Sequence, residues 1–285
     1  MSHLQQEEKS GVIKQNPDYQ PPKSWRTFLI GRPLQTADAS HQTIGKLIGL
    51  AVFASDALSS TAYATQEMMV ILAAAGAAAF QFSFPLSLAI IVLLAIVTLS
   101  YEQTIHAYPN GGGAYIVSRD NLGEFPAQVA GAALLTDYIL TVAVSVSSGV
   151  AQIVSAFPEM YQYRVWLAGI CVVFITIINL RGVRESGTFF AIPSYFFVTM
   201  MYLTVGVGLF RYFTGSLGIV TDPPPMDLLH ELQPVTFFLI LKAFSSGSTT
   251  LTGVEAISNG VTAFKEPRSI NAGKTLMAMS TILGS

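Results

Sequence analysis

The chain has 285 residues, of which 51% are hydrophobic and only 11% are charged. Soluble globular domains carry about 25% charged residues, so this composition excludes an ordinary soluble enzyme. The net charge of -2 gives no reason to expect nucleic acid binding, and the remaining class is a multi-span α-helical membrane protein.

The chain divides into a polar start and an apolar remainder. Residues 1–42 are predicted to form a cytosolic tail, because they contain no apolar core of a secretory signal peptide. Residues 43–285 are predicted to form a transmembrane transporter domain. A spanning helix needs roughly 20 mostly apolar residues. On that basis we expect spans at 44–74, 83–107, 126–157, 164–181, 187–212 and 235–263.

A seventh helix is predicted to begin near Ala272 and to be incomplete at Ser285. We therefore expect the chain to be the N-terminal portion of a longer protein.

The distribution of Lys and Arg predicts the orientation of these spans. With a cytosolic N-terminus, 12 of the 15 Lys and Arg residues fall on the inside, whereas the outside loops hold only Arg164 and Arg211. This bias fits the positive-inside rule. We expect a multi-pass protein of the cell membrane whose N-terminus lies in the cytosol.

The first span contains Asp56 within a cluster of small polar residues at 54–61. The sixth span contains a similar cluster at 245–253. Clusters of Ser, Thr and Gly favour unwinding, since their side chains can replace lost helical hydrogen bonds. Two such breaks five spans apart predict an inverted repeat with discontinuous first and sixth helices around a midplane site. The chain would hold the first repeat and the start of the second.

The third span carries a polar stripe. Its members are separated by three or four residues, which places them on one helical face. They are Asp137, Thr141, Ser145, Ser148 and Gln152. Ser and Thr also mediate close helix packing in membranes, but a carboxylate at the head of the stripe favours an ion-lined face.

Ionisable groups inside spans are costly and usually functional. Asp56, Asp137 and Glu255 are the strong candidates, because each sits beside small polar residues rather than at a helix end. Glu102 is interpreted as an end residue, and Lys242 is open to pairing with a carboxylate.

Other motifs point away from catalysis. The turn Asn110–Gly113 lacks the Lys-Ser/Thr of a phosphate-binding loop and follows a membrane helix, so we interpret it as a flexible turn that opens an inner-face helix. The four histidines have no metal-ligand spacing. We expect no enzyme, no cofactor, and no metal other than transported ions.

Four motifs resemble one transporter family. They are Ser55–Tyr63, Tyr108–Tyr115, Asp137–Ser145 and Leu251–Asn259. These segments resemble the KUP-type potassium transporters, in the KimA-like branch of the amino acid–polyamine–organocation superfamily. The resemblance implies a LeuT-like fold and potassium uptake coupled to protons. It also implies a lipid bilayer, K⁺ and H⁺ as partners, and a homodimer of the full-length protein.

The resemblance also implies site residues by position. The cation-binding residues it implies are Asp56, Tyr63, Asp137, Tyr138, Thr141, Ser145 and Thr252. The carboxylates it links to proton coupling are Glu255 and Asp56.

Two alternatives remain open, an amino acid permease on the same fold and a non-transporting membrane fragment. The fold alone does not decide between substrates. An amino acid carboxylate would favour exposed N–H groups and close approach at glycines. The predicted break at Ser55–Thr61 has no glycine and contains Asp56, which when ionised would repel a carboxylate.

Overall fold

The computed structural model describes residues 24–25, 29, 31, 43–218 and 233–285. The predicted tail at 1–42 lies almost wholly outside the described residues, so the domain boundary stays a prediction.

Within the described residues, regular structure is helical apart from one isolated backbone bridge, which confirms the all-α class. The α-helices are α2 (Lys46–Ala73), α3 (Ser83–Ala107), α4 (Gly113–Leu122), α5 (Glu124–Ala156), α6 (Arg164–Leu180), α7 (Val183–Phe213), α8 (Phe237–Gly247), α9 (Ala256–Asn259) and α10 (Arg268–Gly284). The 3-10 helices are η2 (Ala77–Phe82), η3 (Pro158–Tyr163), η4 (Ser248–Leu251) and η5 (Val261–Ala263). Five helical segments of the described chain are long and apolar enough to cross a membrane, and the protein is a multi-span membrane protein.

The predicted break in the first span is wrong, because α2 is continuous from Lys46 to Ala73. Three of the four hydroxyls in the small polar cluster, those of Ser55, Ser59 and Thr61, donate to carbonyls of their own helix. Ser59 Oγ donates to the Asp56 carbonyl at 2.7 Å, and Thr61 Oγ1 donates to the Ala57 carbonyl at 2.9 Å. Such back-bonding is compatible with an intact helix, and residues 54–61 contain no Gly or Pro to interrupt it.

The predicted break in the sixth span is confirmed. α8 ends at Gly247 and η4 follows at once, after which Thr252 is extended, with φ -64° and ψ 143°. Gly253 has φ +83°, a left-handed value that glycine adopts without steric cost. Helical structure resumes only at Ala256, in α9. The interruption exposes backbone groups in the middle of the sixth span, which is tolerated in a membrane only where protein or a polar cavity covers them.

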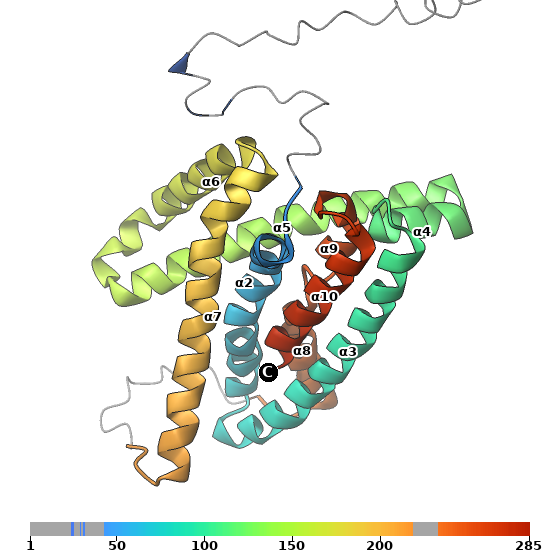
Figure 1. The fold of residues 1–285 in the computed structure, drawn as a ribbon. Coiled ribbons are helices and arrows are strands. Elements are labelled where there is room, and N and C mark those ends of the chain that lie inside the picture. Colours follow the sequence, from blue (N-terminus) through green and yellow to red (C-terminus); the bar gives the residue numbers. More distant parts are fainter. Residues whose placement is uncertain (1–23, 26–28, 30, 32–42, 219–232) are drawn as a thin grey trace, which may run out of the picture.

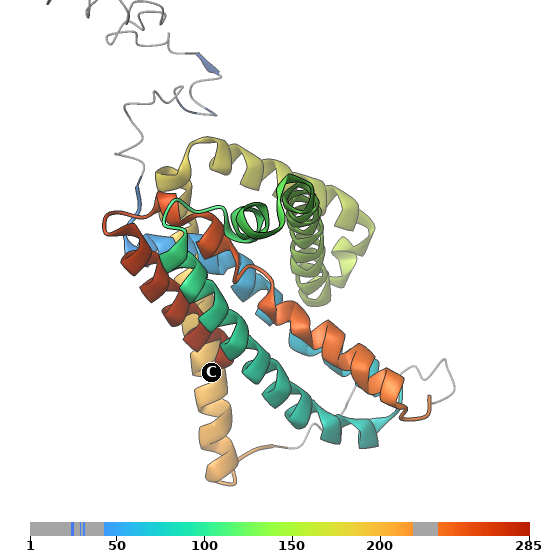
Figure 2. The same ribbon diagram turned by 90° about the vertical axis from the view of Figure 1, so that its right-hand side faces the viewer.

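α2 lies at the centre of the bundle. It contacts α7 on one side and α8 and α10 on the other, while α10 also packs against α3 (Figure 1, Figure 2). Small buried residues recur along α2 every three or four positions, at Ala51, Ala54, Ala57, Ser60 and Ala64. They allow neighbouring helices to approach closely, as is typical of membrane bundles.

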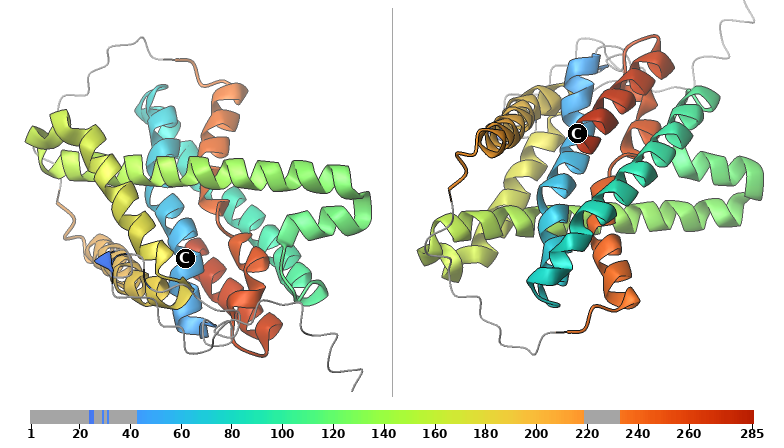
Figure 3. Two further views of the ribbon diagram at one scale, coloured as in Figure 1. Left: turned by 90° about the horizontal axis from the view of Figure 1, so that it is seen from above. Right: turned by 90° about the horizontal axis from the view of Figure 1, so that it is seen from below.

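α5 runs across the direction of the central helices and carries α4 beside its first half (Figure 1, Figure 3). It contacts α2 at one crossing region. This crossing brings the polar stripe of α5 to the central helix.

The end of the interrupted span is fixed to the start of α2. The Ile44 N–H donates to the Ala263 carbonyl at 2.9 Å, and the Lys265 N–H donates to the Ile44 carbonyl at 3.0 Å. The rings of Phe53 and Phe264 stack with centroids 5.2 Å apart. These contacts anchor the C-terminal half of the sixth span against α2, and they leave the break facing the middle of that helix.

Candidate functional site

The site begins where the interrupted sixth span meets α2. A β-carbon at Gly253 would lie 2.8 Å from the Asp56 Cγ and 2.9 Å from the Ala57 nitrogen. No side chain fits at that distance. Gly253 therefore brings the broken backbone against α2 at the position of Asp56.

Hydroxyl groups line this contact. Ser60 is fully buried on α2, and its Oγ lies 2.5 Å from the Oγ1 of Thr252, in the break. The same Ser60 Oγ lies 3.2 Å from the hydroxyl of Tyr63, which is also buried. Two predicted site residues, Tyr63 and Thr252, are thus joined through Ser60.

The polar stripe of α5 faces α2, as its spacing predicts. Ser145 Oγ lies 3.1 Å from Ser59 Oγ, and Gln152 Nε2 donates to Gln66 Oε1 at 3.3 Å. A cavity of about 610 Å³ extends beside these pairs, between α2, α5 and α7. Thr141 lies on the same half-buried side of α5, but among the described residues no side-chain hydrogen bond joins it to α2.

Three carboxylates belong to the elements that meet here. Asp56 lies on α2 beside Gly253, Asp137 lies on α5, and Glu255 lies in the break. Glu255 is only 8% exposed. Within the described residues no three acidic, His or Cys side chains are grouped so as to hold one metal ion together.

Two carboxylate oxygens in this group are buried and lack a hydrogen-bond partner in the described part of the chain. They are Asp56 Oδ1 and Glu255 Oε1. Burying a polar atom without a partner is costly, and the cost rises steeply for an ionised carboxylate. These two atoms are the places where a cation or a proton would lower the free energy of the site.

Tyr138, the residue after Asp137, accepts a hydrogen bond from Asn259 Nδ2 at 2.5 Å. Sequence reasoning did not single out Asn259, Ser59 or Ser60 as site residues, although all three lie within the quoted motifs. The sequence did contain a signal for Ser59 and Ser60, because hydroxyls on a helix face of small residues can form hydrogen bonds across a close helix contact. Nothing in the spacing of Asn259 pointed to Tyr138.

The remaining charged candidates lie outside this group. Glu102 pairs with His106 one turn along α3, with an oxygen–nitrogen distance of 3.0 Å. Lys242 is exposed on α8. The pair formed by Glu102 agrees with its interpretation as a structural residue, whereas among the described residues no ion pair joins Lys242 to a carboxylate.

The glycine-rich turn does open a helix, α4, but it is not a free loop. A β-carbon at Gly111 would lie 2.7 Å from the Asn259 carbonyl oxygen, and one at Gly113 would overlap the Asn259 side chain. The turn is packed against α9 because glycine allows this approach.

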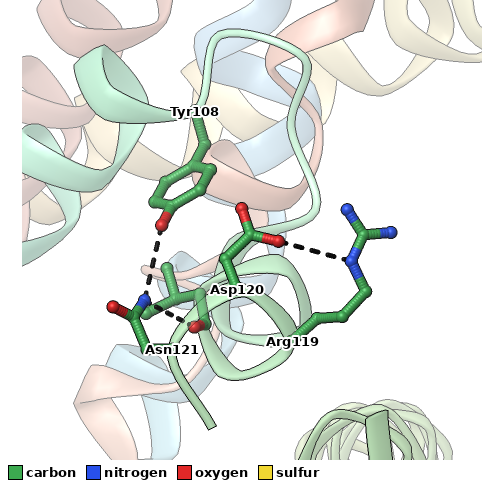
Figure 4. Close-up of polar contacts among 5 residues, drawn as sticks. Tyr108, Arg119, Asp120 and Asn121 are labelled. Atoms are coloured by element: carbon green, nitrogen blue, oxygen red, sulfur yellow. Dashed lines mark hydrogen bonds and ion pairs between the residues drawn. The ribbon is translucent and has the colours of Figure 1, made fainter. Parts of the chain in front are cut away.

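The helix that follows the turn carries its own polar contacts. Asn121 on α4 donates to the Tyr108 hydroxyl at 3.5 Å, and Arg119 pairs with Asp120 (Figure 4).

The fold and the site together define a multi-span helical membrane protein with an internal polar site at an interrupted sixth span. Residues 42–284 match the amino acid permease family, and the chain belongs to this family of the amino acid–polyamine–organocation superfamily.

The chain is also similar to individual transporters with known names. The chain is 49% identical over 262 residues to the potassium transporter KimA of Bacillus subtilis (strain 168), covering 91% of this chain and 42% of that protein. It is 27% identical over 183 residues to the low affinity potassium transport system protein Kup of Pectobacterium atrosepticum, covering 58% of this chain and 28% of that protein. It is 24% identical over 252 residues to the cationic amino acid transporter 7, chloroplastic, of Arabidopsis thaliana, covering 83% of this chain and 40% of that protein.

The resemblance to the KimA-like branch is confirmed by the first of these similarities. The chain spans less than half the length of each of these relatives. All three are transporters by name, and the expectation that this chain is not an enzyme stays a prediction.

Proposed function

We propose that the chain forms the cation-binding part of a secondary active transporter that takes up potassium together with protons across the cell membrane. One observation carries the proposal. Asp56 Oδ1 and Glu255 Oε1 are buried without a hydrogen-bond partner in the described part of the chain, where the broken sixth span packs against α2.

A monovalent cation fits this arrangement by its chemistry. Removing water from a cation is tolerable only if protein oxygens replace that water. The carboxylates of Asp56 and Asp137 supply negative charge. The neutral oxygens of the proposed cation site come from Tyr63, Tyr138, Thr141, Ser145 and Thr252.

Proton coupling is assigned to Glu255, with Asp56 sharing the role. Glu255 is the less exposed residue of the two, and its Oε1 is buried without a hydrogen-bond partner in the described part of the chain. A carboxylate shielded from water and close to like charges is favoured in its protonated form unless a cation is present. Proton occupancy and cation occupancy of the site are then linked.

The names of the relatives support potassium, since KimA and Kup are potassium transporters. An amino acid permease is the second candidate, favoured by the family match and by the similarity to a cationic amino acid transporter. The continuous α2 weighs against it. An unwound first helix would offer free N–H groups to a substrate carboxylate, and α2 keeps those groups in its own hydrogen bonds.

The proposal is tested by expressing the complete protein in a bacterium that lacks potassium uptake systems. We expect the protein to restore growth at limiting K⁺, without saturable uptake of labelled amino acids. Failure to restore growth, together with saturable amino acid uptake, would replace the potassium assignment with the permease.

Glu255→Gln is expected to flatten the pH dependence of K⁺ uptake, because the glutamine amide does not gain or lose a proton as a carboxyl group does. Uptake by the unmodified protein should vary with pH more steeply than uptake by the variant. Glu185→Gln is the matched control, since Glu185 lies on α7 in an exposed ion pair with Arg181. An unchanged pH profile in Glu255→Gln would make Glu255 a structural residue.

We also propose that the N-terminus lies in the cytosol of a cell with this protein in its plasma membrane. The 12-to-2 distribution of Lys and Arg supports this orientation. In a background without Cys171, a cysteine at Ser216 should react with an impermeant thiol reagent from outside, and a cysteine at Asp120 should not. The opposite pattern would reverse the orientation.

A further inference from the structure

Asn259 lies at a junction of three elements. It is the last residue of α9, and its Nδ2 donates to the Tyr138 hydroxyl on α5 at 2.5 Å. Its carbonyl accepts a hydrogen bond from the Gly112 N–H, in the turn between α3 and α4, at 3.3 Å. One half-buried side chain and its own carbonyl therefore connect the sixth span, α5 and the glycine turn.

The turn has the shape that this junction requires. Gly111, Gly112 and Gly113 all have left-handed φ values, of +77°, +100° and +43°. β-Carbons at Gly111 and Gly113 would collide with the carbonyl and the side chain of Asn259, respectively. The turn is thus built around Asn259 rather than merely near it.

The backbone and the partner of Asn259 both lie close in the chain to carboxylate residues. Its N–H donates to the Glu255 carbonyl at 3.1 Å, one turn earlier in the chain. Its partner Tyr138 directly follows Asp137 on α5. Asn259 therefore connects the segment that carries Glu255 with the segment that carries Asp137.

The hydrogen bond leaves the tyrosine able to serve the site. A phenol oxygen carries two lone pairs and one hydrogen. Donation from the Asn259 amide occupies one lone pair and fixes the direction of the hydroxyl. The second lone pair stays available to a cation, and the O–H stays available to a carboxylate.

We propose that Asn259 is a positioning residue, which holds the Tyr138 hydroxyl toward the cation site and ties it to the glycine turn. The inference rests on the proposed potassium function and deepens it. Asn259 acts through Tyr138 and contacts no ion itself.

The test is a double-mutant cycle on K⁺ uptake by the complete protein, with uptake normalised to the amount of protein in the membrane. Asn259→Ala should raise the KM for K⁺ about fivefold, the effect of one lost hydrogen bond, with little change in the maximal rate. In a Tyr138→Phe background the same substitution should change KM by less than about twofold, because the hydroxyl it positions is gone. Asn259→Ser, which keeps a small polar side chain, replaces the alanine variant if that variant does not reach the membrane.

Asn121→Ala is the matched control for the loss of an asparagine. Asn121 also donates to a tyrosine hydroxyl, that of Tyr108, but it lies exposed on α4 (Figure 4). We expect its KM to stay within about twofold of the unmodified protein, since exposed substitutions rarely change energies by more than a few tenths of a kcal/mol.

A second pair of variants tests the link to the turn. Gly113→Ala should displace the Asn259 side chain and raise KM as Asn259→Ala does. Gly123→Ala is its control, because Gly123 also has a left-handed φ, of +96°, but nothing lies within 4 Å of the added β-carbon. The control separates backbone strain from the collision with Asn259.

The outcomes distinguish failure of the positioning role of Asn259 from failure of the proposed potassium transport. Additive effects of Asn259→Ala and Tyr138→Phe, or an unchanged KM in Asn259→Ala, would overturn the positioning role while leaving potassium transport intact. Absence of K⁺ uptake by the unmodified protein would overturn the proposed function, and the positioning role with it.

Discussion

Asp137→Asn is expected to lower K⁺ uptake by the complete protein at limiting K⁺ by roughly 100-fold, as when one member of a buried charge pair is removed. The amide keeps the size of the side chain but removes its charge. The loss should appear in the KM for K⁺, because the site loses one of the two carboxylates that supply negative charge to a cation stripped of water. Isotope or rubidium uptake at several K⁺ concentrations measures this effect.

The control for Asp137→Asn is Asp120→Asn. Asp120 is an exposed carboxylate on α4 and pairs with its neighbour Arg119 (Figure 4). Exposed ion pairs contribute roughly 0–1 kcal/mol, so this variant should transport normally. Equal uptake by the two variants would mean that the charge of Asp137 does not serve the cation.

Gly253→Ala is expected to abolish most transport, because the added β-carbon meets both a backbone and a side chain of α2. A left-handed conformation costs a non-glycine residue roughly 1–2 kcal/mol. Forcing an extra carbon into a packed contact adds about 1–3 kcal/mol. The broken span must move away from Asp56, and we expect K⁺ uptake to fall by at least about tenfold in line with these energies.

Gly215→Ala separates strain from collision in this experiment. Gly215 has φ +66°, and nothing lies within 4 Å of a β-carbon built on it. Uptake and membrane levels of both variants are measured together. If Gly253→Ala transports as well as Gly215→Ala, the close contact between the break and α2 is not needed for function.

The membrane class, the helical spans and the interrupted sixth span were predictable, because apolar length and Ser/Gly/Thr clusters are local features. α3 has the bounds of the span predicted at 83–107. The sixth span carries two glycines in its cluster, and Gly253 supplies a left-handed residue within the break.

The first span was mispredicted for a local reason as well. Its cluster at 54–61 is rich in hydroxyls but has no glycine, and Ser59 and Thr61 bond back to carbonyls of their own helix. A cluster of hydroxyls alone does not decide between unwinding and back-bonding. Glycine in the cluster is the feature that separates the two spans.

The candidate site was partly predictable. Costly charges inside spans pointed to Asp56, Asp137 and Glu255, and two of these residues, Asp56 and Glu255, have buried oxygens without a hydrogen-bond partner in the described part of the chain. The link between Asn259 and Tyr138 joins residues 121 positions apart in the chain. It depends on how α5 crosses the sixth span and on the glycine turn, and helical periodicity carries no information about such a crossing.

We expect a transported cation to occupy the space beside the carboxylate oxygens of Asp56 and Glu255 that have no hydrogen-bond partner in the described part of the chain. The most direct measurement is K⁺ flux into proteoliposomes that contain the purified complete protein, with an imposed inward proton gradient and with labelled amino acids assayed in parallel. We predict saturable K⁺ uptake that the gradient accelerates and that excess amino acids do not inhibit. Saturable amino acid uptake without K⁺ flux would contradict the account.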